Sequence, residues 1–106
     1  MLFGLKDETV EKINSVFARF PHVETAVIYG SRAKGNFKNG SDIDLTIDGE
    51  GLDLIILNKI KREIDDLLLP YTVDLSIRMH IKNPDLLDHI ERVGSVFYKK
   101  QNSSID

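Results

Sequence analysis

Three aspartates are the residues of this sequence that could do chemistry together. Asp42 and Asp44 stand one residue apart in the segment SDIDLTID, and Asp74 stands in the segment TVDLSI. Because side chains of a strand alternate between its faces, Asp42 and Asp44 would share one face, roughly 7 Å apart at the backbone. Like charges at that distance repel each other, so the pair predicts that a cation belongs between them. Mg²⁺ favours carboxylate oxygens together with substrate phosphate.

Asp74 completes the acidic set. Its apolar neighbours Val73 and Leu75 would point to the opposite face of a second strand. Three acids on two neighbouring strands could hold two metal ions about 3.5–4 Å apart, which suits in-line phosphoryl displacement. We therefore predict that Asp42, Asp44 and Asp74 are the catalytic and metal-binding residues, with two Mg²⁺ ions, or Mn²⁺, as the cofactor.

A glycine–serine turn precedes the acidic pair. Gly30 ends the apolar run ETAVIYG and suits a sharp turn with close backbone approach. If Ser31 caps a short helical turn over residues 31–34, the first amides of that turn point outward as an anion site. Arg32 and Lys34 would then add positive charge for the same phosphates. We predict Gly30, Ser31, Arg32 and Lys34 as nucleotide-binding residues, with a triphosphate and its metal ions between this turn and the acids.

The sequence lacks residues that two other phosphate- or metal-binding motifs require. A P-loop needs Gly-Lys followed by Ser or Thr, and here Asn36 follows Gly35. An EF-hand loop starting at Asp44 puts Ile55 where a bidentate Glu is required, and the register starting at Asp42 lacks the glycine. Neither motif explains the acidic pair.

The bulk composition limits the class of protein. A chain of 106 residues makes one domain, which we take as 1–100, with 101–106 as a frayed tail. The net charge of −3 argues against a broad nucleic-acid surface. The absence of cysteine excludes disulfides and thiolate metal sites. No apolar stretch reaches the roughly 20 residues of a membrane span, and the N-terminus lacks the pattern of a signal peptide, so we expect a cytoplasmic protein.

Hydrophobic periodicity predicts the elements that position these residues. Proline and glycine residues mark the ends of three expected helices, four expected strands and the short turn described above. The expected helices are 7–20, 53–69 and 84–93, and the expected strands are 24–30, 41–48, 71–77 and, less regularly, 95–100. The fold class is α/β (α+β), a small mixed β-sheet of three to four strands covered by three helices. His22, His80 and His89 share no spacing with the acids, and we expect them at the surface.

The signature as a whole resembles a known family. Gly30-Ser31, ten residues, and then Asp42-x-Asp44 is similar to the pattern of the DNA polymerase β-like nucleotidyltransferase superfamily. The finer match, GSRAKG and SDIDL with a later VDL, resembles the minimal nucleotidyltransferases (MNT domains) and extends from the first helix to about Tyr98. The resemblance implies the nucleotidyltransferase fold and transfer of a nucleoside monophosphate from an NTP to a hydroxyl.

The resemblance also implies roles and partners. Asp42 and Asp44 would bind two Mg²⁺ ions, Asp74 would complete the acceptor-side metal and help deprotonate the attacking hydroxyl, and Gly30 and Ser31 would hold the phosphates. Family members of this size are often encoded beside HEPN-domain proteins as toxin–antitoxin pairs. Some of them transfer AMP from ATP onto a tyrosine of the HEPN toxin and so silence it.

Three functions therefore stay open at this point. The first is Mg²⁺-dependent transfer of AMP to a partner protein, as the antitoxin of a HEPN/MNT pair. The second is a binding module that neutralises a partner toxin by masking it. The third is transfer to a small molecule of the aminoglycoside type. Because 106 residues hold the catalytic sheet and its helices and little else, we expect the acceptor surface to come from another chain or a second copy of this one.

Overall fold

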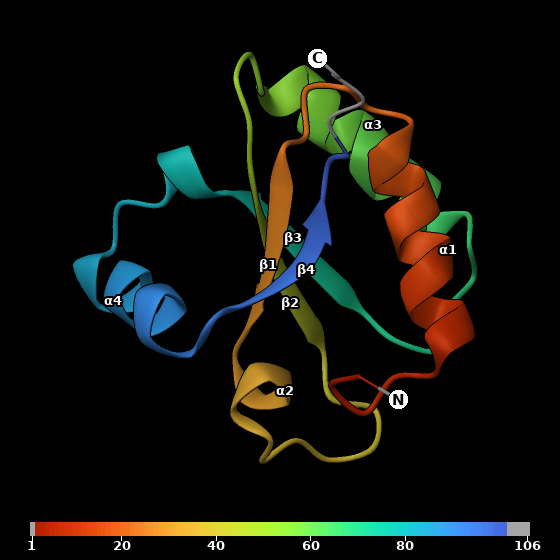
Figure 1. The fold of residues 1–106 in the computed structure, drawn as a ribbon, viewed down its shortest axis with the longest axis vertical. Helices are drawn as coiled ribbons and strands as arrows, with labels where there is room; N and C mark the ends of the chain where they lie inside the picture. The colour runs from red at the N-terminus through yellow and green to blue at the C-terminus, as the bar shows by residue number, and fades with distance from the viewer. Residues whose placement is uncertain (1, 102–106) are drawn as a thin grey trace.

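The computed structural model describes residues 2–101, in which helices and strands alternate (Figure 1). The expected tail therefore lies outside the described residues from position 102 onward. The elements in chain order are α1 (Asp7–Ala18), β1 (Thr25–Tyr29), α2 (Ser31–Lys34), β2 (Ile43–Asp48), α3 (Leu54–Asp65), β3 (Val73–Ile77), the 3-10 turn η1 (Arg78–His80), α4 (Pro84–Val93) and β4 (Ser95–Lys99).

The four strands form one mixed sheet in the order β3-β2-β1-β4. β1 runs antiparallel to β2 and to β4, whereas β2 and β3 are parallel and are joined by the crossover helix α3. A parallel pair needs such a crossover, because a short turn cannot return the chain to the start of the next strand. The predicted fold class, a small mixed sheet with helices, is confirmed.

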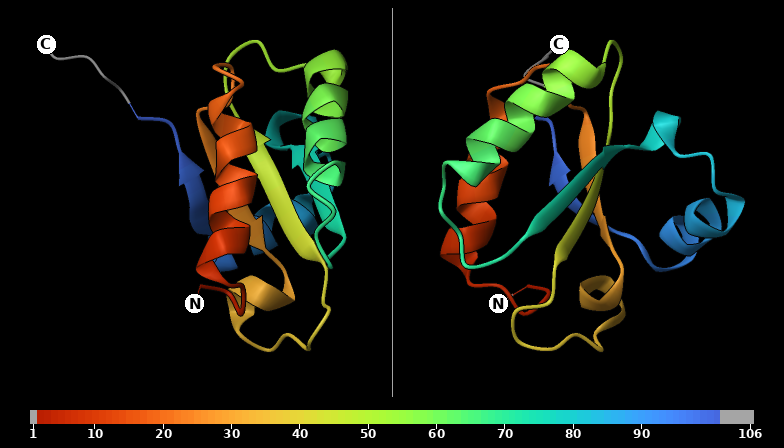
Figure 2. Two further views of the ribbon diagram at one scale, coloured as in Figure 1. Left: turned by 90° about the vertical axis from the view of Figure 1, so that its right-hand side faces the viewer. Right: turned by 180° about the vertical axis from the view of Figure 1, so that it is seen from behind.

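The helices divide between the two faces of the sheet. In Figure 1, α1 and α3 lie on one side of the sheet and α4 lies on the other, and the left view of Figure 2 looks onto the face that α1 and α3 cover. The main core fills the space under α1 and α3, where apolar side chains of both helices meet those of the strands. Its members include Ile13, Phe17, Ile28, Ile43, Leu45, Ile47, Ile60 and Leu75.

Local signals set most of the helix boundaries. α4 spans the predicted residues, because Asn83 Oδ1 accepts the backbone N–H groups of Asp85 and Leu86 at 2.9 and 3.4 Å. α3 begins after Asp53, whose Oδ1 accepts the N–H of Ile56 at 2.9 Å. Both are side-chain caps of the kind that a sequence reveals. Within residues 2–101, no helix combines the length and apolar character that crossing a membrane requires.

The end of α3 differs from the prediction. The periodic pattern predicted a helix through residue 69, but α3 ends at Asp65. Leu68, expected on the buried stripe, has φ +56° and is 87% exposed. The chain must reverse there to enter β3, and a residue in the left-handed conformation ends a helix. α1 likewise ends at Ala18, earlier than predicted.

Candidate active site

Two of the predicted aspartates lie side by side on neighbouring strands. The parallel register of β2 and β3 places Asp44 opposite Asp74. Both alternate with core-facing residues such as Leu45 and Leu75, so they belong to the face that α1 and α3 leave open. Asp44 is half-buried, whereas Asp74 is exposed on the edge strand, and Asp42 is exposed just before β2. The structure therefore brings Asp74 to the level of Asp44.

The three carboxylates interact electrostatically. The pKa of Asp44 is raised by burial first, then by the negative charge of Asp74, and then by that of Asp42. His89 opposes this rise in the pKa of Asp44. A carboxylate whose pKa is raised by other carboxylates is one whose charge would be stabilised by a nearby cation.

The residues predicted to hold Mg²⁺ have the donor chemistry that this ion prefers, but they are not gathered into a ligand set. Carboxylate oxygens beside a phosphate are what a hard divalent cation prefers, and the charges around Asp44 fit that group. Within residues 2–101, however, no three Asp, Glu, His or Cys side chains are gathered closely enough to hold an ion. The side chains of Asp42, Asp44 and Asp74 would have to turn toward one another to hold Mg²⁺.

Gly30 lies directly against Asp44. Tyr29 is the register partner of Asp44, and Gly30 follows it with φ +76°, a conformation that side chains other than glycine rarely adopt. A Cβ atom at residue 30 would collide with Oδ2 of Asp44. α2 then begins at Ser31 as predicted, although Gly30 rather than Ser31 is its N-cap. Lys34 is exposed at the end of this short helix.

Arg32, which the sequence predicted as a phosphate-binding residue, lies in the interior. Its side chain is 3% exposed. Nε donates to the carbonyl of Ser41 at 3.0 Å, and Nη1 donates to the carbonyl of Phe3 at 2.9 Å. The guanidinium carbon lies 5.0 Å from the ring centre of Phe37 and 4.9 Å from that of Tyr71. Arg32 therefore links the loop before β2 to the N-terminal segment, and these contacts occupy its Nε and Nη1 groups.

His89 is a site residue that the sequence did not reveal. We expected it at the surface, remote from the acids, but its Nε2 accepts the backbone N–H of Gly30 at 3.0 Å. Its ring also lies edge-on to Tyr29, with 6.1 Å between the ring centres. The cap at Asn83 signalled the helix that carries His89, but no local spacing connects residue 89 with residue 30.

Hydroxyl groups extend the site along the same face. Ser76 Oγ donates to Thr46 Oγ1 at 3.1 Å, and Thr46 Oγ1 donates to the carbonyl of Ser76 at 3.3 Å. Thr46 is fully buried, although the alternating pattern placed it on the exposed face. Burial raises the pKa of the Tyr29 phenol, a hydrogen bond with Ser76 opposes that shift, and the charges of Asp74 and Asp44 add to it.

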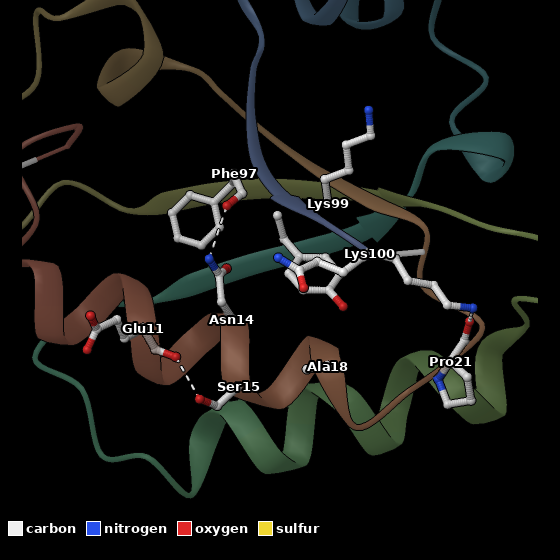
Figure 3. A pocket seen from close by; sticks show the side chains of 10 residues that line it. Glu11, Asn14, Ser15, Ala18, Pro21, Phe97, Lys99 and Lys100 are labelled. Atoms are coloured by element: carbon white, nitrogen blue, oxygen red, sulfur yellow. Dashed lines mark hydrogen bonds between the residues drawn. The ribbon is translucent and has the colours of Figure 1, made fainter. Parts of the chain in front are cut away.

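A large groove of the molecule does not coincide with the three aspartates. A groove of about 800 Å³ lies between α1 and β4, lined by Asn14, Tyr98 and neighbouring residues, and none of the three aspartates lines it (Figure 3). Asn14 there donates to the carbonyl of Phe97 at 3.2 Å. Asp74 instead lines a smaller groove of about 170 Å³ beside α3. We assign the site from its side-chain geometry, since phosphoryl chemistry depends on charges and donors more than on groove volume.

Comparisons with known proteins identify the family of the chain. The family model described as polymerase beta, nucleotidyltransferase, matches residues 11–103, which include all the site residues named above. A probable protein adenylyltransferase MntA of Haemophilus influenzae is 28% identical over 100 residues, which cover 93% of this chain and 87% of that protein.

Solved structures share the fold. A toxin–antitoxin crystal structure with AMP-PNP superposes with a TM-score of 0.68 at 20% identity, over 92% of this chain and 76% of the other. A complex of a tri-AMPylated Shewanella oneidensis HEPN toxin with its MNT antitoxin gives a TM-score of 0.66 at 17% identity, over 91% of this chain and 74% of the other.

Proposed function

This chain belongs to the polymerase beta nucleotidyltransferase family, and from that premise we propose that it transfers AMP from ATP to a hydroxyl of a partner protein. The observation that carries the proposal is the juxtaposition of two strands, β2 and β3, with the turn that follows β1. Asp44 lies opposite Asp74 across two parallel strands, and Gly30, directly after β1, lies against Asp44. A turn for phosphates and a pair of acids are thus adjacent.

The residues divide the reaction between them. Ser31 and Lys34, beside Gly30, would hold the triphosphate, while Asp42 and Asp44 would hold Mg²⁺. Bound there, Mg²⁺ would neutralise charge on the phosphates and on the attacking and leaving oxygens. Asp74 would accept the proton of the acceptor hydroxyl. The hydroxyl oxygen then bonds to the α-phosphorus while the α–β phosphoanhydride bond breaks, and pyrophosphate leaves.

The position of Asp74 favours an acceptor supplied by another molecule. β3 is an edge strand and Asp74 is exposed on it, so a hydroxyl can approach from outside the sheet. The names of the relatives point to the same kind of acceptor, since one is a probable protein adenylyltransferase and another accompanies a tri-AMPylated HEPN toxin. We propose a HEPN toxin as the partner, this chain as its antitoxin, and the cytoplasm as their location.

The test is intact-mass analysis of the partner. The chain is incubated with each NTP, Mg²⁺ and a purified HEPN toxin, and one or more added AMP masses are expected on the toxin with ATP. Asp48→Ala is the matched control for Asp44→Ala and should keep the transfer activity. Asp48 lies on the same face of β2 but pairs with Arg78 at 3.9 Å. No mass gain on the partner with any NTP would contradict the proposal. A gain on an aminoglycoside instead would identify a small-molecule acceptor.

Masking is the alternative function, because the related antitoxins occur in complexes with their toxins. The Asp44→Ala variant distinguishes the two functions. If transfer is the mechanism, the variant binds the toxin but no longer neutralises it at equal concentration. If the variant still neutralises the toxin, masking explains the function.

A further inference from the structure

We propose that His89 is a positioning residue, which holds the Gly30–Ser31 turn at the Asp44–Asp74 pair by accepting the Gly30 N–H. This inference rests on the proposed nucleotidyl transfer and adds to it a fourth segment, α4, that the signature does not contain. The residue would act through the turn and does not itself touch the reacting atoms.

His89, on α4, contacts Gly30 and the residue before it. Its Nε2 accepts the N–H of Gly30 at 3.0 Å. Its half-buried ring lies edge-on to Tyr29, the residue before Gly30, with ring centres 6.1 Å apart. Tyr29 pairs in turn with Asp44. His89 therefore contacts the last residue of β1, Tyr29, and the residue that connects β1 to α2, Gly30.

This hydrogen bond changes the role expected for Gly30. An N–H that donates to an imidazole is not free to donate to a phosphate while that bond stands. What Gly30 supplies is the absence of a side chain, since a Cβ atom would collide with Asp44 Oδ2. The phosphates are then left to donors after Gly30. Accepting this bond requires an Nε2 that carries no proton.

The rest of α4 is held independently of His89. Ile90 is 2% exposed, Asn83 caps the start of the helix, and Glu91 pairs with Arg78 at 3.6 Å. Gly94 at the end of the helix lies against Val27 of β1. These contacts should keep the helix in place when the imidazole is replaced, so the effect of a substitution can be attributed to the turn.

Two variants at one position test the proposal. His89→Leu removes the acceptor, whereas His89→Gln keeps one, because its amide oxygen can accept the Gly30 N–H. His80→Leu is the matched control, since His80 is exposed on η1. The readouts are the hydrogen-exchange rate of the Gly30 amide, measured by NMR, and the Kd for AMP-PNP with Mg²⁺.

We expect faster Gly30 exchange in His89→Leu and AMP-PNP binding weaker by about tenfold, the scale of one lost hydrogen bond. His89→Gln should largely restore both values, and His80→Leu should leave both unchanged. Unchanged binding and exchange in a folded His89→Leu protein would overturn the proposal, and so would failure of the Gln variant to restore either one.

Two further measurements keep the outcomes separate. If His89→Leu does not fold, the imidazole nitrogen shifts of the wild-type protein decide, because a proton on Nε2 would contradict the bond to Gly30. If the wild-type chain binds no AMP-PNP at millimolar concentration with Mg²⁺, nucleotidyl transfer itself is contradicted. Gly30 exchange in the variants would then still report whether His89 holds the turn.

Discussion

The two faces of the sheet have opposite characters, although the same strands supply both. On the face under α1 and α3, Ile43, Leu45 and Ile47 are all fully buried in a continuous apolar core. On the opposite face, β2 presents Asp44, whose pKa is raised first by burial and then by the charges of two other carboxylates. One face stabilises the fold, and the other keeps unfavourable charges together for chemistry. The difference teaches that stability and activity should be separable by substitutions one residue apart.

The largest expected effects come from alanine substitutions at two adjacent residues of β2. Asp44→Ala should lower the transfer rate by about a thousandfold or more, because losing metal stabilisation removes several kcal/mol from the transition state. Leu45→Ala should instead lower the free energy of unfolding by about 2–5 kcal/mol, since Leu45 is fully buried. Transfer per folded molecule should survive in Leu45→Ala. Rate assays and urea denaturation of both variants check the pair, and an Asp44→Ala protein that remains active would refute the assignment of the faces.

The two basic residues of α2 should separate an effect on stability from an effect on nucleotide binding. Arg32→Met should cost about 2–3 kcal/mol of stability, because two carbonyls lose a charged donor in a buried place. Lys34→Met removes the same charge from an exposed position, so stability should change by less than about 0.5 kcal/mol. AMP-PNP affinity should fall a few-fold in the Lys34 variant only. A stable Arg32 variant that fails to bind AMP-PNP would restore the phosphate role predicted from the sequence.

Two glycines test whether close approach to Asp44 matters beyond backbone conformation. Gly30 and Gly40 have φ values of +76° and +82°, but only the Cβ added at residue 30 meets another side chain. Alanine at either position should cost roughly 1–3 kcal/mol, because a positive φ is strained for a residue that carries a side chain. Gly30→Ala should lose additional stability and most of its transfer activity, whereas Gly40→Ala should keep its activity. Equal losses in the two variants would show that the contact with Asp44 is unimportant.

The smallest expected effect concerns the charge on Asp44. Its pKa is raised in the folded protein above the ordinary value of 3.8, so the folded state binds this proton more readily than the unfolded state. The charged carboxylate therefore opposes folding above the raised pKa, and this penalty disappears as the pH falls below the ordinary value.

Asp44→Asn should accordingly raise the melting temperature slightly at pH 8, with the difference from wild type shrinking as the pH falls toward 4. Mg²⁺ should raise the melting temperature of the wild-type chain more than that of the variant, because the ion would bind the charged carboxylate. Thermal melts across pH, with and without Mg²⁺, make the measurement. A variant less stable than wild type at pH 8 would contradict the electrostatic account.

Local patterns predicted the elements well where the deciding contacts were also local. The side-chain cap at Asn83 set the start of α4, and the short helix over residues 31–34 followed from the glycine–serine turn. The prediction failed where a distant segment decided. α3 stops early because the chain must turn back into β3, and Arg32 is buried because Phe3 and Tyr71 meet it from remote parts of the chain.

The sequence by itself determined that β2 has one apolar and one acidic face, because side-chain alternation along a strand is a property of the backbone alone. It also determined that a glycine turn precedes those acids. Only the tertiary structure decided that Asp74 lies opposite Asp44, that Gly30 lies against Asp44, and that His89 accepts the N–H of Gly30. The register of paired strands and the seating of a helix depend on packing between segments far apart in the chain, and no local spacing records that packing.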